Sequence, residues 1–217
     1  MSRSPPCSSL DDDAALNVTA IYIVGPSSTG KTTLCNALAA QLGLAPNLHI
    51  SEVARTVMKE QGFSRATVGS LAMQRAIVQA QVVHDRDARQ NAIKPFNSLV
   101  AGVGGRRGVV LCDRSAVDAV VYSALSGEEG DAQTLIASEE FQSVLPAYRS
   151  PRATFVLLGP ISNWLFDDGI RSLEDGARCH AMFKKILGEL GIPFMDMGEN
   201  CRWLEERVAF VRRCVWL

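Results

Sequence analysis

Five short apolar runs alternate along the chain with longer amphipathic stretches. The apolar runs are rich in aliphatic residues, as buried strands are, and they cover residues 19–24, 47–51, 108–112, 154–158 and 193–197. The amphipathic stretches have helical spacing, and they cover residues 30–42, 52–60, 69–92, 116–125 and 131–148. A last helix carries an apolar stripe at Leu204, Val208, Val211 and Val215. This alternation predicts an α/β fold, with a five-stranded parallel sheet and helices on both faces.

A glycine-rich motif joins the first strand to the first helix. Residues 25–32 read GPSSTGKT, which is the G-x-x-x-x-G-K-[ST] pattern in its expected context. Backbone N–H groups in such a loop bind phosphate oxygens, so we expect a P-loop NTPase fold that binds ATP and Mg²⁺. The expected nucleotide contacts are Gly25, Ser27, Ser28, Thr29, Gly30, Lys31, Thr32 and Thr33. Lys31 would reach the β- and γ-phosphates, and Thr32 would ligate Mg²⁺. The alternative is a glycine–serine turn that matches by accident.

A carboxylate and an arginine stand at the end of the third strand. Asp113 follows an apolar run, where a Walker B aspartate holds Mg²⁺ or its water. Alternatively, Asp113 caps the helix that begins near Ala116. Arg114 follows directly, as in many nucleoside and nucleotide kinases, where it meets the acceptor or its phosphate. The third strand lacks D-x-x-G and the chain lacks N-K-x-D, which argues against a GTPase.

The acceptor side is predicted just beyond the second strand. Glu52 starts a helix on which Arg55 and Lys59 share its face, so Glu52 and Arg55 are candidate acceptor residues. Glu52 would take the acceptor's hydroxyl proton or complete the Mg²⁺ shell. Alternatively, it is a first-turn acid stabilised by the helix dipole, with Ser51 as the N-cap.

Several polar side chains on the long helix 69–92 are further candidates, namely Gln74, Gln79, Gln81 and His84. A glutamine in the acceptor pocket would read a base or amide edge, and Gln74 is our candidate for that role. The alternative is that these residues form the polar face of the helix.

The segment after the fourth strand is predicted to be a lid. Arg171 and Arg178 are seven residues apart, and Gly169 and Gly176 would serve as hinges. Small P-loop kinases place here a mobile segment whose arginines close over the transferring phosphate. Arg171 is our candidate catalytic residue, and the alternative is a surface helix with ordinary ion pairs.

Composition narrows the class of protein. With 217 residues we expect a disordered tail at residues 1–17 and one P-loop kinase domain at residues 18–217. A net charge of −1 with no basic stripe argues against a nucleic acid partner. The tail lacks a secretory pattern and no segment is long enough to span a membrane, which predicts a cytoplasmic protein with reduced cysteines. The last four residues match C-a-a-X at Cys214, but Val215 continues the helical stripe, so we expect no prenylation.

Four segments together carry a family resemblance: GPSSTGKTTL, ISEVAR, VVLCDRSAVDAVVY and WLFDDGIR. They resemble a family of small AAA-type P-loop proteins that is similar to the nicotinamide riboside kinase domain of bifunctional NAD-biosynthesis proteins. The resemblance covers about residues 18–213. It implies nucleotide and metal roles for Lys31, Thr32 and Asp113, and acceptor and lid roles for Glu52, Arg55, Arg114 and Arg171.

Two functions follow from these observations. The first is a Mg²⁺-ATP-dependent kinase that phosphorylates a hydroxyl of a small metabolite, either nucleoside-like or a specialised natural product. The second is a nucleotide-binding regulatory or lipid-associated protein with slow hydrolysis.

Overall fold

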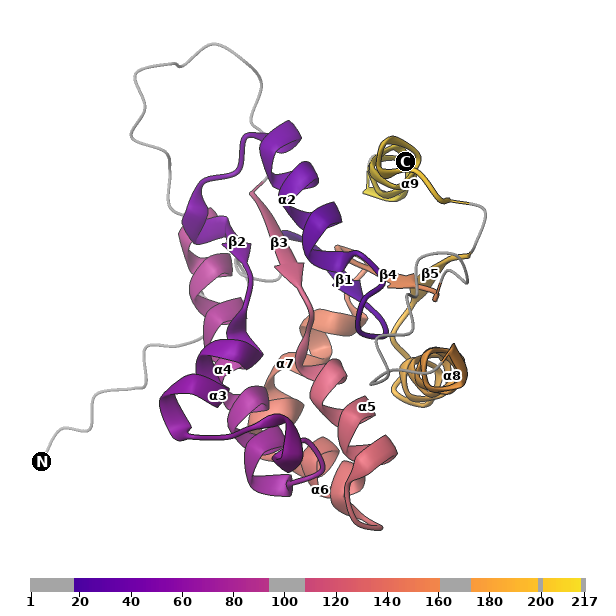
Figure 1. Cartoon of the computed structure of the whole chain (residues 1–217). Coiled ribbons are helices and arrows are strands. Elements are labelled where there is room, and N and C mark those ends of the chain that lie inside the picture. Colours follow the sequence, from indigo (N-terminus) through magenta and orange to yellow (C-terminus); the bar gives the residue numbers. More distant parts are fainter. Residues whose placement is uncertain (1–17, 94–107, 161–172, 199–200, 216–217) are drawn as a thin grey trace, which may run out of the picture.

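The sheet at the centre of the molecule has five strands, and all neighbouring strands pair in parallel in the order β2-β3-β1-β4-β5 (Figure 1). A computed structural model describes residues 18–93, 108–160, 173–198 and 201–215, so the predicted tail at residues 1–17 lies outside the described residues. The strands are β1 (Thr19–Val24), β2 (His49–Ile50), β3 (Val109–Asp113), β4 (Ala153–Leu158) and β5 (Phe194–Met197).

Helices cover both faces of this sheet. They are α2 (Lys31–Leu42), α3 (Val53–Gln61), α4 (Leu71–Ile93), α5 (Ala116–Ser126), α6 (Asp131–Ala137), α7 (Glu139–Arg149), α8 (Leu173–Glu189) and α9 (Leu204–Val215). In β1 the side chains alternate, because successive residues of a strand point to opposite faces. Tyr22 belongs to the buried cluster that includes residues of α3 to α8, whereas Ile21 and Ile23 belong to the cluster that includes residues of α2 and α9. The predicted α/β fold is confirmed, with helices on both faces of a five-stranded parallel sheet.

Two elements differ from the sequence-based expectation. The single helix predicted over residues 131–148 is wrong, because α6 and α7 are separate helices. Ser138 lies between them with an extended backbone (ψ 147°), and its side chain accepts a hydrogen bond from the N–H of Phe141 as the N-cap of α7. The predicted strand 47–51 is also shorter, since Pro46–Leu48 forms a 3₁₀ turn and only His49–Ile50 pairs with β3.

A buried polar network fixes α4 against the central strand. The Tyr22 hydroxyl donates to Asp85 Oδ2 at 2.7 Å, and Arg89 Nε donates to Asp85 Oδ1 at 2.9 Å. Arg89 Nη2 also donates to the Tyr22 hydroxyl at 2.6 Å. All three residues are buried, and removing one partner would leave a buried charge without compensation. The network therefore holds α4, which carries Gln74 and Gln81, at a fixed position on β1.

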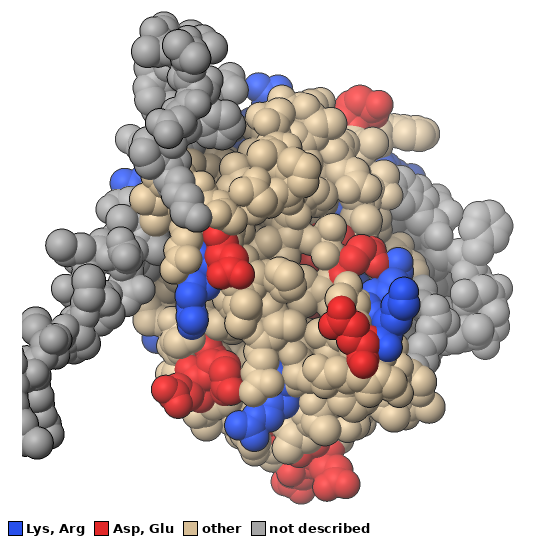
Figure 2. Space-filling model, turned by 90° about the vertical axis from the view of Figure 1, so that its left-hand side faces the viewer, with Lys and Arg blue, Asp and Glu red and all other residues tan. Residues whose placement is uncertain are grey.

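The surface charges and the cysteines of the described residues show no concentrated site of their own. Acidic and basic side chains are mixed in small groups on the face shown in Figure 2, around a largely uncharged centre. Within the described ranges, no helix has both the length and the apolar character needed to cross a bilayer. The described cysteines are free thiols, namely Cys35, Cys112, Cys179, Cys201 and Cys214.

Candidate functional site

The P-loop connects β1 to α2 and approaches β4 closely. Gly25 has φ +136°, and a Cβ built on it would lie 2.5 Å from the carbonyl oxygen of Leu158. No other residue type fits there without moving β4. Gly30 has φ 81° and ends the loop where α2 begins, a conformation that only glycine adopts readily. The loop predicted from the sequence therefore has backbone reasons for both of its motif glycines.

Lys31 lies folded back inside this loop. Its side chain is buried, and its ammonium group donates to the carbonyl oxygen of Pro26 and to Thr29 Oγ1 at 3.4 Å. Burial, together with the nearby positive charge of Arg114, lowers the pKa of Lys31 to about 7. An anion bound in the loop would offset that cost of burying the charge.

Thr32 and Asp113 are 81 residues apart in sequence and meet at the mouth of the loop. Thr32 Oγ1 donates to Asp113 Oδ2 at 2.5 Å. Asp113 Oδ1 is buried and has no hydrogen-bond partner. Such an orphaned carboxylate oxygen beside a P-loop hydroxyl fits Mg²⁺, which binds through one or two carboxylates, waters and phosphate oxygens. The described residues contain no gathering of three or more His, Cys, Asp or Glu side chains as a metal site.

Arg114 is held rigidly in the space between the P-loop and α5. Its backbone is left-handed (φ 86°), and its Nη1 atom lies 3.1 Å from Asp118 Oδ1. Its guanidinium carbon lies 5.9 Å from the centre of the Tyr122 ring. Burial alone would lower the pKa of Arg114, but Asp118 and Tyr122 raise it above its usual value. The guanidinium is therefore a permanent positive charge in a fixed place.

Asp118 also forms part of the cap of α5. Ser115 is the N-cap, and its side chain accepts from the N–H of Val117, while Asp118 Oδ2 accepts from the N–H of Ser115 at 2.9 Å. This is a capping box. The alternative interpretation of Asp113 as the cap of this helix is therefore wrong. Burial raises the pKa of Asp118, and Arg114 and Lys31 oppose that rise.

Glu52 lies directly before α3 with a left-handed backbone (φ 58°), so the alternative with Ser51 as N-cap and Glu52 in the first turn is wrong. Glu52 Oε2 lies 2.6 Å from Arg55 Nη1, and both side chains are well exposed. Together with Ser28 in the P-loop and Arg114, Glu52 completes the set of described non-glycine residues with positive φ. Strained backbone of this kind gathers at functional sites, and here Glu52 and Arg114 line one space, while Ser28 lies in the P-loop beside it.

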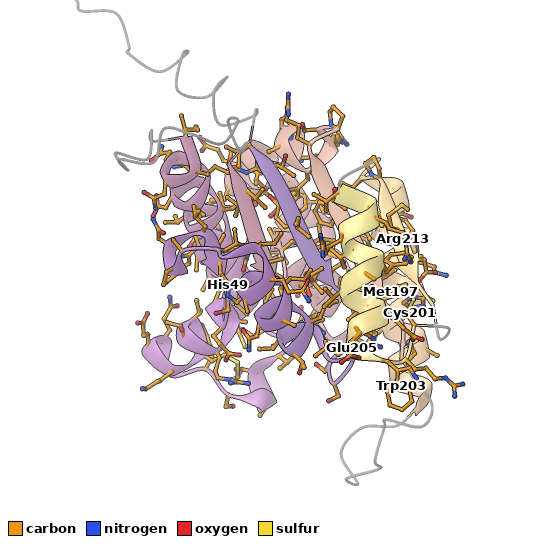
Figure 3. All side chains as sticks on the ribbon, turned by 90° about the horizontal axis from the view of Figure 1, so that it is seen from above. His49, Met197, Cys201, Trp203, Glu205 and Arg213 are labelled. Carbon is orange, nitrogen blue, oxygen red and sulfur yellow. The ribbon has the colours of Figure 1, made fainter. Side chains whose placement is uncertain are left out.

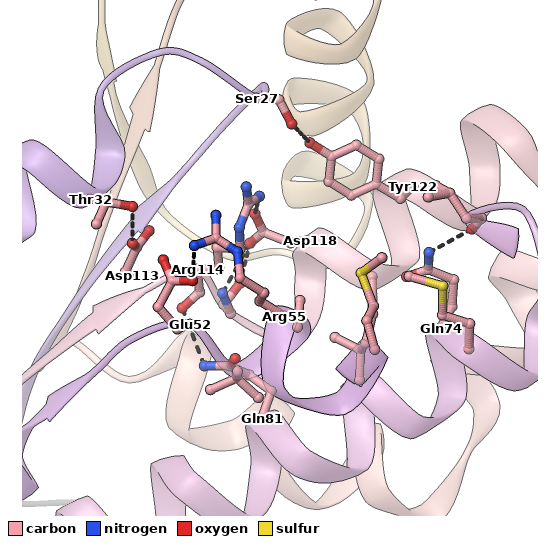
Figure 4. Close-up of a pocket in the computed structure, with 18 residues that line it drawn as sticks. Ser27, Thr32, Glu52, Arg55, Gln74, Gln81, Asp113, Arg114, Asp118 and Tyr122 are labelled. Carbon is pink, nitrogen blue, oxygen red and sulfur yellow. Dashed lines mark hydrogen bonds and ion pairs between the residues drawn. The ribbon is translucent and has the colours of Figure 1, made fainter. Parts of the chain in front are cut away.

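That space is a pocket of about 490 Å³ between α3, α4, α5 and the P-loop (Figure 4). Its polar residues are Ser27, Thr32, Glu52, Arg55, Gln74, Gln81, Asp113, Arg114, Ser115, Asp118 and Tyr122. The sequence-based candidates that the structure brings together here are Thr32, Glu52, Arg55, Gln74, Gln81, Asp113 and Arg114. Ser27 also joins the wall, with its Oγ 3.0 Å from the Tyr122 hydroxyl.

Five described candidates outside the P-loop do not line this pocket. Gln79 is exposed and donates to Glu140 at 2.8 Å, and His84 and Lys59 are also exposed. Arg171 and Gly169 lie outside the described residues, so the predicted lid has no structural account. Arg178 is exposed on α8, and Gly176 lies inside that helix.

Sequence analysis missed Asp118, Tyr122 and Arg207 as site residues. Asp118 could have been found from the sequence, because it follows Arg114 by four residues, the spacing at which an acid and an arginine often pair. Arg207 carried none. It is buried on α9, and its Nη1 donates to the carbonyl of Thr29 in the P-loop at 2.7 Å. Its Nε donates to the carbonyl of Cys201 at 2.9 Å, and Figure 3 shows Cys201 and Trp203 on the side of the sheet that α9 covers.

Most of the chain matches one known protein family. Residues 20–207 match the AAA_28 family, which is described as an AAA domain. The chain belongs to this family. An ABC transporter G family member 7 from Arabidopsis thaliana is 30% identical over 124 residues, which make up 50% of this chain and 16% of that protein.

Solved structures with the same fold are distant in sequence. A NadR protein in complex with NR superposes on this member of the AAA_28 family with a TM-score of 0.65 and 16% identity, covering 95% of this chain and 53% of that chain. Deoxyadenosine kinase from M. mycoides with bound dATP gives a TM-score of 0.53 and 12% identity, covering 90% and 97% of the two chains. The protein therefore has a P-loop kinase fold and spans about half of the NadR chain.

Proposed function

We propose that this protein is a Mg²⁺-ATP-dependent kinase that transfers the γ-phosphate to a hydroxyl group of a small metabolite. The observation that carries the proposal is the position of Arg114. It lines the pocket and lies close enough to Lys31 to lower the pKa of that residue. A fixed cation between a phosphate loop and a pocket is suited to a phosphoryl group in transit.

The P-loop half would hold ATP. Lys31 would leave its contact with Pro26 and bind the β- and γ-phosphates. Thr32 and the orphaned Oδ1 of Asp113 would hold Mg²⁺, which would offset charge on the phosphates. The NadR structure in complex with NAD and AMP-PNP and the deoxyadenosine kinase structure with dATP support the binding of a nucleotide, because those proteins share the fold.

The acceptor would lie in the pocket with a hydroxyl group near Glu52. Its oxygen would attack the γ-phosphorus as the bond from that phosphorus to the bridging oxygen of ADP breaks. The hydroxyl proton would pass to the Glu52 carboxylate, whose side chain is 40% exposed and therefore reachable. Arg114 would stay beside the transferring group throughout, because Asp118 holds it in place.

Mass spectrometry tests the proposal directly. The protein is incubated with Mg²⁺-ATP and a metabolite mixture, and we expect one metabolite to gain a single phosphate as ADP forms in equal amount. The Lys31→Ala variant should lose this transfer while remaining folded. ADP formation with no phosphorylated metabolite would instead support the second function, a nucleotide-binding regulatory or lipid-associated protein with slow hydrolysis.

A further inference from the structure

Tyr122 connects the pocket to the P-loop through its side chain. It lies half-buried on α5, and its hydroxyl oxygen is 3.0 Å from Ser27 Oγ. Both residues line the pocket, and Figure 4 shows the hydroxyl pointing at Ser27. Ser27 stands four residues before Lys31 in the phosphate motif. The Tyr122 hydroxyl therefore lies at the boundary between the P-loop and the pocket.

Two cations lie beside this tyrosine. The Arg114 guanidinium carbon is 5.9 Å from the centre of the Tyr122 ring. Burial lowers the pKa of Arg114, but Asp118 and then Tyr122, in part through a hydrogen bond, raise it. Lys31 is close enough to Arg114 that burial and then the charge of Arg114 lower the pKa of Lys31. A phosphate group held between Lys31 and Arg114 would therefore lie within reach of the Tyr122 hydroxyl.

The neighbours of Tyr122 decide where its hydroxyl proton points. A guanidinium group can only donate, so the tyrosine oxygen accepts in its hydrogen bond with Arg114. Burial and then Asp118 raise the pKa of Cys179 on α8 to about 11 despite a hydrogen bond with Tyr122. The Cys179 thiol therefore stays protonated, and its sulfur is a weak acceptor. Of Arg114, Cys179 and Ser27, the Ser27 oxygen is the one suited to accept the proton of the tyrosine hydroxyl.

A phosphate oxygen would be a stronger acceptor for this proton than the Ser27 hydroxyl. Hydrogen bonds to an ionised acceptor are about twice as strong as those between neutral groups. Ser27 is partly exposed, so water can replace the tyrosine as its partner. Exchanging Ser27 for phosphate would therefore leave no buried polar group unpaired, and it would give the phosphate a third donor beside Lys31 and Arg114.

We infer that Tyr122 is a further catalytic residue, whose hydroxyl leaves Ser27 when Mg²⁺-ATP binds and donates a hydrogen bond to an oxygen of the γ-phosphoryl group beside Arg114. The hydroxyl keeps its own proton while the phosphoryl group moves from ADP to the acceptor oxygen. The inference rests on the proposed function for the transfer itself, but contact with the γ-phosphoryl group requires only that the nucleotide binds.

A mimic of the γ-phosphoryl group tests this contact without any acceptor. Mg²⁺-ADP alone, and Mg²⁺-ADP with beryllium fluoride in place of the γ-phosphoryl group, are titrated into the full chain by calorimetry. Tyr122→Phe keeps the ring and removes the O–H donor. We expect its affinity for the beryllium fluoride complex to fall at least tenfold, with the affinity for Mg²⁺-ADP within about twofold of wild type. A tyrosine with only a structural role would weaken both complexes alike or neither, and either result would overturn the inference.

Ser123→Ala is the matched control on the same helix. It removes a hydroxyl from the next residue of α5, which does not line the pocket, and this buried hydroxyl has no hydrogen-bond partner among the described residues. Both complexes should bind to this variant as they do to wild type. If Ser123→Ala loses the beryllium fluoride complex as strongly as Tyr122→Phe does, the effect comes from α5 as a whole and the role of the Tyr122 hydroxyl is refuted.

Turnover with Mg²⁺-ATP and the metabolite mixture separates this inference from the proposed function. If the wild type phosphorylates a metabolite, Tyr122→Phe should do so at least tenfold more slowly. Phosphate transfer by the wild type, together with unaltered beryllium fluoride binding in Tyr122→Phe, would keep the kinase and refute the role of Tyr122. No phosphate transfer by the wild type, together with a selective loss of the beryllium fluoride complex in Tyr122→Phe, would refute the kinase and keep the contact.

Discussion

The two faces of the sheet support the two halves of the site by different means. On the α2 and α9 face, the P-loop is held mainly through its backbone, by the close packing of Gly25 on Leu158 and by Arg207 on the carbonyl of Thr29. On the α3 to α5 face, the pocket is shaped by side-chain ion pairs, of which Arg114–Asp118 is the partly buried one. The proposed phosphate half is thus preformed by main-chain geometry, whereas the proposed acceptor half depends on the identity of individual side chains.

This difference implies that nucleotide binding and acceptor binding can be impaired separately. A change on one face should alter the handling of nucleotide and leave acceptor binding alone, and a change on the other face should do the reverse. Asp113 and Tyr122 are the exceptions, because both line the pocket and reach the other half, Asp113 beside Thr32 and Tyr122 at Ser27.

The largest effect is expected from Asp113→Asn, at the place where the two halves meet. The amide still accepts from Thr32 but cannot offer a charged oxygen to Mg²⁺, so turnover should fall about a hundredfold or more, on the scale of a lost electrostatic stabiliser. Initial rates over a Mg²⁺ titration measure the effect. Asp87→Asn, exposed on α4, is the control, and an unaltered Mg²⁺ dependence in Asp113→Asn would rule out the metal role.

Asp118→Asn should damage only the acceptor half. Without its carboxylate partner Arg114 is held by fewer and weaker bonds, so acceptor turnover should drop at least tenfold. The free energy of unfolding should fall by about 1–3 kcal/mol, the usual cost of an unsatisfied buried group. Steady-state kinetics and urea unfolding measure the two changes. Calorimetry should show the ATP dissociation constant within about twofold of wild type, and a large rise in it would contradict the separation of the halves.

Arg207→Gln is the reverse experiment on the other face. Losing the guanidinium bond to the Thr29 carbonyl should loosen the P-loop and raise the ATP dissociation constant about tenfold, since a charged hydrogen bond contributes about 1.5–3 kcal/mol. Acceptor affinity should not change. Arg207→Lys should restore part of the ATP affinity, and Arg212→Gln, exposed on the same helix, should match wild type. If Arg207→Gln only lowers the unfolding temperature and leaves the ATP dissociation constant unchanged, Arg207 has a structural role alone.

The smallest effect is expected for Arg55→Ala. Its ion pair with Glu52 is exposed, with 82% of the Arg55 side chain accessible, and such pairs contribute about 0–1 kcal/mol to stability. Thermal unfolding should therefore barely move, as for Lys185→Ala in the exposed pair with Glu189. Any kinetic change should appear in the Michaelis constant of the acceptor. A loss of stability as large as that of Asp118→Asn would show that the exposed Arg55–Glu52 pair contributes as much as the partly buried Arg114–Asp118 pair.

The sequence alone determined the five-stranded parallel sheet and the P-loop, and it named Thr32 and Asp113 as candidate metal ligands. These features depend on local patterns: buried strands read as apolar runs, the glycines mark required backbone conformations, and parallel strands bring their carboxyl ends to one edge. Glu52, Arg55 and Arg114 could be named for the same reason, because each follows the end of a strand. The break at Ser138 was missed because a single capping serine outweighed a continuous apolar pattern.

Only the tertiary structure decided how these residues are combined. Gln81 on α4 donates to the carbonyl of Arg114 at the end of β3, across 33 residues of sequence, and Asp118 is buried because α5 packs into the core. Arg207 illustrates the limit, because its partner Thr29 is 178 residues away. A helical arginine reads as a solvent-exposed charge in sequence, and only the packing of α9 beside α2 buries it against the P-loop carbonyl.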